Sequence, residues 1–447
     1  MSGTLEAWIE AQTARAVQAM LRSISATELV KTRPGFGQTI RPLRGSIVAS
    51  PVLGAYDPDP DYFFHWYRDS ALVIDALRLL QANDQLGPLA IAHLADFVRF
   101  SAALARLDGR ALVADAGWRA AVAPDFERFV RPNSELASAH GAAIPGETRV
   151  NPDGTLDISR WGRPQHDGPA LRALALLRWT ESLRLPSPLQ TELDAQLRVD
   201  LYYTLAHGHE PCVDIWEEEV GRHYYTLRVA SAALESGGVW LARRGECAAG
   251  EACQAQSRAL LAQLDDYWIA EAGHYRSRVL SDGARSSKEL DIAVVLATVH
   301  ARGRGLRHSP LDPKVQATLA RLEALFDAAY PINHGREPDS SPALGRYAGD
   351  VYYSGGAYFF ATLGAAELCY LAGAGEATVE ARRAWLAHGD GFLQTVRRYT
   401  PADGQMAEQF DQRSGAPSSA KHLAWSYAAF LTCVGARRDT SARAGNC

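Results

Sequence analysis

Residues 61–82 read DYFFHWYRDSALVIDALRLLQA, and this stretch combines the two features that decide the fold. Its first part is rich in aromatic and charged side chains. Its second part, from Arg68 onward, carries apolar residues three and four positions apart. That spacing predicts an amphipathic helix over residues 68–82, entered from an aromatic loop. The same succession of loop and helix recurs along the chain.

Helical windows of this kind account for most of the 447 residues, whereas the alternating pattern of strands is nearly absent. The sequence therefore predicts an all-α protein. We expect twelve helices, at residues 4–22, 68–82, 86–107, 165–183, 187–207, 222–242, 250–270, 286–299, 312–331, 351–373, 375–398 and 418–437.

The connections between these helices alternate in length. Those after the second, fourth, sixth and tenth helices have only a few residues, so the helices that they join are antiparallel neighbours. The connection after the eighth helix, about a dozen residues long, fits this rule less well. Those after odd-numbered helices are long, as at residues 208–221 and 108–164. Six hairpins with all the longest connections at one end predict an (α/α)6 barrel, a closed toroid with its site in the long-loop mouth. An α-solenoid is the alternative, but no repeat of fixed length is apparent.

The composition excludes several classes of protein. The chain has 46 Lys+Arg against 51 Asp+Glu, a net charge of -5 and no polybasic tract, which argues against a nucleic-acid partner. Residues 357–374 are the most apolar stretch, but Glu367 interrupts them, so we expect no membrane span. Residues 1–24 lack the pattern of a signal peptide, which leaves the compartment open. No linker or shift in composition divides the chain, so we expect one domain over residues 1–447.

Metal and nucleotide chemistry find no support in the motifs. The run HGHE at residues 207–210 places its ligands too close together for a full coordination shell, and no GxSxG, HExxH or GxxxxGK motif is present. We therefore expect neither a metal nor an organic cofactor. Cys247 and Cys253 are close enough in sequence to form a disulfide, but two free thiols fit as well.

Aromatic and charged residues concentrate in five of the long connections, at residues 61–69, 160–168, 214–219, 345–350 and 408–411. Aromatic faces stack on the C–H faces of sugars, and charged groups bond to sugar hydroxyls. In one loop alone, such side chains would be explained by packing at the barrel end. Five such loops at one end favour a carbohydrate site.

Six motifs in these regions, taken in order, resemble the glucoamylases of glycoside hydrolase family 15. They are WxRDS at residues 66–70, WGRPQxDGPALR at 161–172, DxWEE at 214–218, GRY at 345–347, EQFD at 408–411 and WSYA at 425–428. The resemblance implies an inverting exo-hydrolase on an (α/α)6 barrel, which releases β-glucose from the non-reducing ends of α-1,4-glucans or malto-oligosaccharides.

The same resemblance implies the roles of individual residues. Glu217 corresponds to the general acid and Glu408 to the general base. Contacts to the sugars are implied for Tyr62, Trp66, Arg68, Asp69, Trp161, Trp216, Glu218, Arg346 and Trp425. For Arg346 the alternative is a salt bridge to Asp350. Glu219 stands where the family has an apolar residue, and we expect it to be a solvated loop charge.

Departures from the family pattern leave the substrate linkage open. Residues 346–350 read RYAGD where the family has RYPED, residues 354–358 read SGGAY in place of NGNPW, and His166 replaces a commonly basic residue. Cleavage of α-1,6 bonds or of trehalose therefore stays possible. A non-catalytic carbohydrate-binding toroid would lose a carboxylate, whereas both Glu217 and Glu408 are present. We see no starch-binding module, and we expect a monomer that acts on soluble α-gluco-oligosaccharides.

Overall fold

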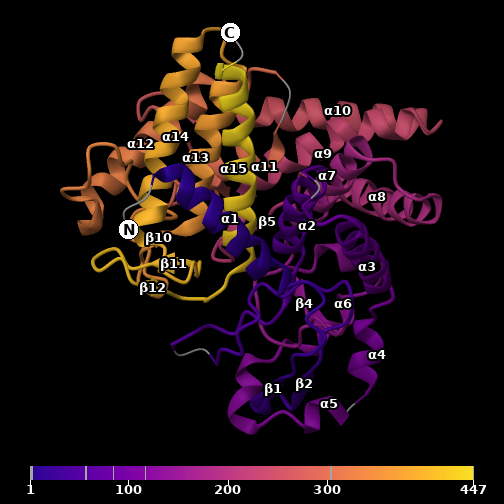
Figure 1. Ribbon diagram of the computed structural model, residues 1–447. Helices are drawn as coiled ribbons and strands as arrows, with labels where there is room; N and C mark the ends of the chain where they lie inside the picture. The colour runs from indigo at the N-terminus through magenta and orange to yellow at the C-terminus, as the bar shows by residue number, and fades with distance from the viewer. Residues whose placement is uncertain (1–3, 56–57, 84, 116, 303–304, 446–447) are drawn as a thin grey trace.

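A computed structural model of the chain describes residues 4–55, 58–83, 85–115, 117–302 and 305–445 (Figure 1). All twelve predicted helices are present, and they form two sets of six. The more buried set comprises α2 (Tyr67–Ala82), α7 (Asp167–Ser182), α9 (Tyr224–Ala242), α11 (Ala293–Ala301), α13 (Phe359–Gly375) and α15 (Ala424–Gly445). The second set comprises α1 (Leu5–Leu21), α3 (Pro88–Leu104), α8 (Ser187–His207), α10 (Cys247–Asp265), α12 (Pro313–Ala329) and α14 (Val379–Tyr399).

The six more buried helices form a closed ring. In chain order α2, α7, α9, α11, α13 and α15 each pack on the next, and α15 packs back on α2. That last contact excludes the open α-solenoid. Each of the first five inner helices is followed by its outer partner, and α1 packs on α15. The predicted (α/α)6 barrel is therefore confirmed.

The distribution of apolar residues explains which helices lie inside. In α13 every residue from Phe359 to Tyr370 is buried, as expected for a helix enclosed on all sides. In α14 the buried residues lie on one face and include Gly389, where a Cβ atom would come within 2.5 Å of the Tyr370 ring. This glycine lets the inner and outer helices of the pair approach closely.

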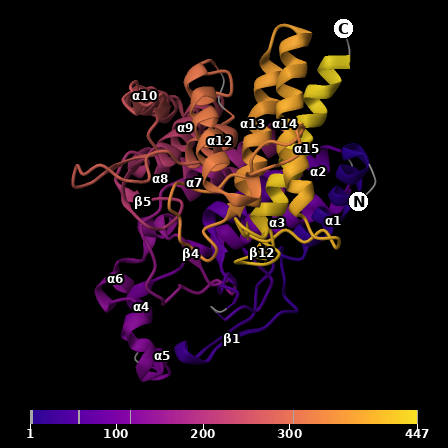
Figure 2. The same ribbon diagram turned by 90° about the vertical axis from the view of Figure 1, so that its left-hand side faces the viewer.

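Every inner helix begins where a long connection ends, so the six N-termini and the long connections gather at one end of the barrel. We call this end the mouth. Both views place β1 (Lys31–Arg33), α4 (Gly109–Ala114), α5 (Gly117–Ala120) and α6 (Asn133–Ser138) beyond the helical bundle (Figures 1 and 2). The positive ends of the inner helix dipoles consequently point towards the mouth.

The long connections contain short antiparallel strands that the periodicity of the sequence did not reveal. Besides β1 they are β2 (Gln38–Ile40), β3 (His65–Trp66), β4 (Arg149–Val150), β5 (Cys212–Val213), β6 (Val220–His223), β7 (Trp268–Ile269), β8 (His274–Tyr275), β9 (Arg278–Leu280), β10 (Ala357–Tyr358), β11 (Gln409–Phe410) and β12 (Pro417–Ser418). They pair as β1-β2, β3-β4, β5-β6-β9, β7-β8 and β10-β11-β12. Because the strands have two to four residues, they fix the loops without forming an extended sheet.

Three predicted helices begin six or more residues later than expected. Helix α11 begins at Ala293 rather than residue 286, α13 at Phe359 rather than 351, and α15 at Ala424 rather than 418. Gly355, Ser419 and His422 have positive φ angles of 56°, 62° and 50°, which a right-handed helix excludes. The residues before α13 and α15 are therefore loop and line the mouth.

The two cysteines left open by the sequence lie in α10. Cys247 is an exposed free thiol, and Cys253 is a buried free thiol. They do not form the disulfide that their spacing allowed.

Candidate active site

One cavity at the mouth has a volume of about 380 Å³ and brings the predicted site together. All eleven site residues named from the sequence line it: Tyr62, Trp66, Arg68, Asp69, Trp161, Trp216, Glu217, Glu218, Arg346, Glu408 and Trp425. The rest of the wall is formed by Gly162, Ile215, Tyr352, Phe360 and Leu423. Residues from five different long connections thus surround one space.

Glu217 lies at the tip of the turn between β5 and β6. Asp214 holds this turn, because its carbonyl accepts the Glu217 N–H at 2.9 Å and its carboxylate accepts the Glu218 N–H at 2.7 Å. The φ angle of Glu217 is 65°, a conformation that is costly for a residue with a side chain. The hydrogen bonds of Asp214 therefore maintain a strained turn, and Glu217 at its tip lines the cavity.

Both carboxylate oxygens of Glu217 accept hydrogen bonds from indoles. Trp66 donates its Nε1–H to Oε1 at 2.8 Å, and Trp161 donates its Nε1–H to Oε2. The Arg68 guanidinium lies 3.6 Å from Oε1. Three groups from two loops and a helix therefore fix the orientation of this carboxyl.

Glu408 has a different environment. Tyr62 donates its hydroxyl to Oε1 at 3.2 Å, and Ser419 donates to Oε2. Burial raises the pKa of Glu408 to about 7, although the hydrogen bonds from Ser419 and Tyr62 and the charge of Arg346 favour the carboxylate. A carboxyl with this pKa can exchange a proton near neutral pH.

An aromatic wall connects the two glutamates. The rings of Tyr62 and Trp66 are 5.2 Å apart, and each of the two side chains binds one of the carboxyls. The Tyr62 hydroxyl also lies 2.9 Å from that of Tyr352. The wall offers an apolar face between two titratable groups.

Several buried polar atoms in the cavity have no hydrogen-bond partner among the described residues. They are Arg68 Nε, Asp69 Oδ2 and Trp425 Nε1, of which the first two lie 3.4 Å apart as an ion pair. Burial raises the pKa of Asp69 to about 6, against the opposing charge of Arg68. Such atoms are stabilised when a ligand with hydroxyl groups occupies the cavity.

Arg346 forms the salt bridge that its sequence suggested and also lines the cavity. Its Nε donates to Asp350 at 2.6 Å, and its Nη2 donates to Glu218 at 3.1 Å. Glu218 further accepts from Lys288 at 2.7 Å and from Tyr347 at 2.6 Å. Although burial disfavours the charge, Arg346, Lys288 and Tyr347 hold the pKa of Glu218 below its ordinary value.

The expectation for Glu219 was wrong. Its carboxylate is not a solvated loop charge, since it accepts hydrogen bonds from Arg278 at 2.8 Å and Ser286 at 2.9 Å. The same Arg278 binds Asp214 at 2.7 Å, so this ion pair supports the turn that carries Glu217. Glu219 is not among the residues that line the cavity.

Sequence reasoning missed Tyr352, Phe360 and Ser419. Phe360 stacks on Trp425 with ring centroids 4.0 Å apart and forms the floor beneath its indole. Tyr352 and Ser419 fell within helices that were predicted to begin too early. The glycines at positions 355 and 356 were the available signal that residue 352 belongs to the mouth.

The described residues contain no group of three or more His, Cys, Asp and Glu arranged to hold a metal ion. In the HGHE run, His207 instead pairs with Glu210 at 2.9 Å. Within the same residues, no helix has the length and apolarity required to cross a membrane.

Comparison with known families decides the relationship. The model for glycosyl hydrolases family 15 matches residues 128–435, which is more than half of the chain. The chain belongs to this family. It is therefore a glycoside hydrolase of the glucoamylase-like type, as the six motifs predicted.

Relatives named as glucoamylases are similar to most of the chain. The glucoamylase of Neurospora crassa is 30% identical over 433 residues, covering 88% of this chain and 63% of that protein. The probable glucoamylase of Schizosaccharomyces pombe is 26% identical over 470 residues, covering 96% and 91%. The chain thus spans less than two thirds of the first relative and nearly all of the second.

Solved structures of glucoamylases share the fold. The Glycoside Hydrolase Family 15 Glucoamylase from Hypocrea jecorina superposes with a TM-score of 0.77 at 25% identity, over 97% of this chain and 72% of that one. Glucoamylase from Saccharomycopsis fibuligera superposes with a TM-score of 0.78 at 21% identity, over 98% and 96%. The second likeness, at this identity, concerns the fold alone.

Proposed function

We propose that the protein is an inverting, exo-acting α-glucosidase that releases β-glucose from the non-reducing ends of α-1,4-glucans and malto-oligosaccharides. The observation that carries this proposal is the placement of two differently held carboxyls, Glu217 and Glu408, on one cavity. The names of the relatives, glucoamylases, supply the substrate class.

The order of the helices in the ring supports the assignment of these two carboxyls. The turn with Glu217 leads into α9, the third inner helix, and the loop with Glu408 leads into α15, the sixth. In a closed ring of six, the third and sixth members lie opposite each other. An inverting enzyme needs this arrangement, because about 6.5 to 9.5 Å between the carboxyls leaves room for a water molecule.

The proposed reaction is a single displacement. Glu217 donates its proton to the glycosidic oxygen as the bond to the anomeric carbon breaks. Glu408 accepts a proton from the water that attacks this carbon on the opposite face, so the configuration inverts. The products are β-glucose and a shortened chain, and proton exchange with solvent restores both carboxyls.

Binding of the terminal glucose is assigned to the polar atoms that have no hydrogen-bond partner among the described residues. Arg68, Asp69 and Trp425 offer donors and acceptors for hydroxyl groups, and the Tyr62 and Trp66 rings offer an apolar face. A cavity of about 380 Å³ closed by several loops suits one chain end rather than the middle of a polymer.

Because the ring closes between α15 and α2, we propose that residues 1–447 act as one catalytic unit.

The test is a time course of digestion followed by proton NMR and chromatography. We expect β-glucose as the first product, with α-glucose appearing only by mutarotation, and no early oligosaccharides. Initial α-glucose would refute the assigned pair, and early oligosaccharides would refute the exo mode. Parallel assays on maltose, maltotriose, isomaltose, dextran and trehalose distinguish α-1,4 cleavage from the α-1,6 and trehalose alternatives.

A further inference from the structure

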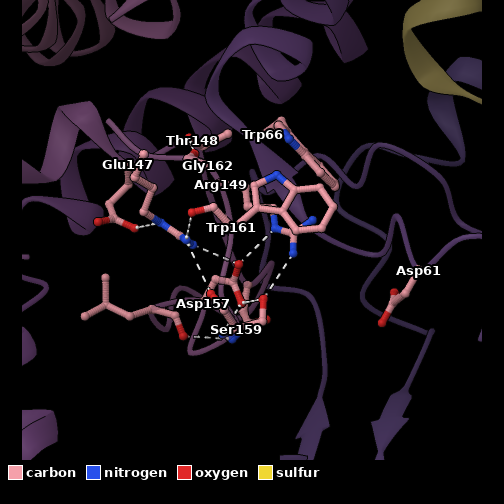
Figure 3. A network of polar contacts seen from close by, with 12 residues as sticks. Asp61, Trp66, Glu147, Thr148, Arg149, Asp157, Ser159, Trp161 and Gly162 are labelled. Atoms are coloured by element: carbon pink, nitrogen blue, oxygen red, sulfur yellow. Dashed lines mark hydrogen bonds and ion pairs between the residues drawn. The ribbon is translucent and has the colours of Figure 1, made fainter. Parts of the chain in front are cut away.

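Against the two indoles that bind Glu217 lies a buried cation, Arg149 (Figure 3). It belongs to β4, where it pairs directly opposite Trp66 of β3. Its side chain is only 4% exposed, and nothing in the proposed reaction uses it. A buried guanidinium is costly unless its surroundings compensate for the lost water, so its contacts require an explanation.

The guanidinium of Arg149 lies against three aromatic rings. Its Cζ atom is 3.6 Å from the ring centroid of Trp161, 3.9 Å from that of Phe64 and 4.7 Å from that of Trp66. Figure 3 shows it behind the Trp161 ring, between that indole and the polar network below. Two of these rings are the indoles whose N–H groups bind the two oxygens of Glu217.

A polar network binds one edge of this cation. Arg149 donates to Asp157 at 2.9 Å through Nε and to Ser159 at 3.1 Å through Nη2. Asp157 is held in turn by Arg163 at 2.8 Å and by the Ser159 backbone N–H at 2.9 Å. Although burial favours the neutral acid, Arg149 and Arg163 keep the pKa of Asp157 well below its usual range. The planar guanidinium is thus hydrogen-bonded at one edge and lies over the aromatic rings.

We propose that Arg149 is a positioning residue for the general acid. It holds the Trp66 and Trp161 rings in the planes that allow both N–H groups to reach Glu217, and thereby directs the carboxyl towards the leaving oxygen. This inference rests on the proposed function, in which Glu217 is the acid. A displacement of about 1 Å at a reacting group can cost about 10²-fold in rate, so a residue that acts only through the indoles can have a large effect.

The discriminating experiment compares two substrates that differ in their need for an acid. Maltose must lose a sugar alkoxide, which requires protonation, whereas α-glucosyl fluoride loses fluoride, a far better leaving group. We expect Arg149→Met to lower kcat on maltose about 10²-fold, and kcat on the fluoride less than tenfold, with little change in KM. Glu217→Gln provides the reference, because it should show the same selectivity in stronger form.

Arg149→Lys separates charge from shape. Lysine keeps the positive charge but loses the planar guanidinium that lies over both indoles and binds two acceptors. We expect its kcat on maltose to lie between those of the wild type and Arg149→Met, with the same preference for the fluoride. Should Arg149→Met fail to fold, the lysine variant alone carries the comparison.

The matched control is Arg33→Met. Arg33 is also buried, also lies over the Phe64 ring, at 3.8 Å, and also forms an ion pair, with Asp61 at 2.6 Å. Within the described chain its guanidinium lies over neither indole. Any loss in this variant should be equal on the two substrates.

Three outcomes would overturn the inference. Equal losses on maltose and the fluoride in Arg149→Met would mean that the residue supports the fold rather than the acid. A change confined to KM would place its effect in sugar binding. A wild-type enzyme that is inactive on both substrates would overturn the proposed function and, with it, this inference. Failure of the inference alone gives a different result, because the wild type is then active.

Discussion

Removal of the Ser419 hydroxyl is expected to move the acidic limb of the pH profile to higher pH. This hydroxyl donates to Oε2 of Glu408, a bond that favours the carboxylate over the acid. The proposed base works only when ionised, and burial raises its pKa to about 7 in the intact protein. Ser419→Ala should therefore make the base harder to ionise.

The size of the shift follows from the strength of the bond. Hydrogen bonds to charged groups contribute about 1.5 to 3 kcal/mol, and one pKa unit corresponds to about 1.4 kcal/mol. Because the Tyr62 bond at 3.2 Å remains, we expect the limb to move by about one pH unit. At pH 6 the ionised fraction of Glu408 would fall from about one tenth to about one hundredth.

The assay is kcat/KM on maltose between pH 4 and 9, since this parameter reports the ionisation of the free enzyme. We expect a tenfold loss at pH 6 and almost none at pH 9. Ser419 has a φ angle of 62°, so Ser419→Gly serves as a second variant that suits this backbone. The matched control is Ser426→Ala, because that buried hydroxyl donates at 2.8 Å to the Ala407 carbonyl and not to a carboxylate.

Two results would refute this reasoning. If the limb of Ser419→Ala stays in place while that of the wild type lies near pH 7, the hydroxyl does not hold the ionised base. If the wild-type limb lies near pH 4.5, the pKa of Glu408 has its ordinary value, and burial does not raise it as the reasoning requires.

Two further predictions concern the carboxyls themselves. Glu217→Gln and Glu408→Gln should each lower kcat, measured by glucose release, by about 10²- to 10⁴-fold, and Glu219→Gln should lower it far less. If Glu219→Gln is inactive while Glu217→Gln is active, the acid is misassigned. Glu408→Gln should also stabilise the fold at high pH, because a folded pKa of about 7 against an ordinary value of 4.5 makes ionisation cost about 3 kcal/mol of folding free energy. Its Tm should exceed that of the wild type above pH 7 and match it below pH 4.

The fold could be predicted from the sequence because the patterns that indicate it are local and repeated. Helical periodicity and the lengths of the connections depend on residues close together in sequence, so the twelve helices and the closed ring followed from them. The start of α15 could not be predicted, because Ser419 and His422 adopt positive φ angles that only the folded chain imposes. The two-residue strands depend in the same way on partners far along the chain.

The site residues could be predicted from the sequence for a different reason. Its aromatic and charged residues are unusual in loops, and the family motifs fix their order. The support beneath them gave no such signal, since Arg149, Asp157 and Ser159 are ordinary polar residues in a connection of more than 50 residues. Only the folded chain brings the Arg149 guanidinium to 3.6 Å from the Trp161 ring.

The mouth concentrates features that each destabilise the folded state. Glu217 has a strained φ angle, Glu408 is buried and ionisable, and Arg68 and Trp425 keep polar atoms without hydrogen-bond partners in the described chain. Each feature costs on the order of 1 to 3 kcal/mol, a large share of the stability of an ordinary domain. A ring in which every inner helix packs on two others can hold these groups in place, because moving one loop would disturb the helices on both sides. The closed barrel thus supplies the rigidity that the proposed acid and base, which precede opposite helices of the ring, require.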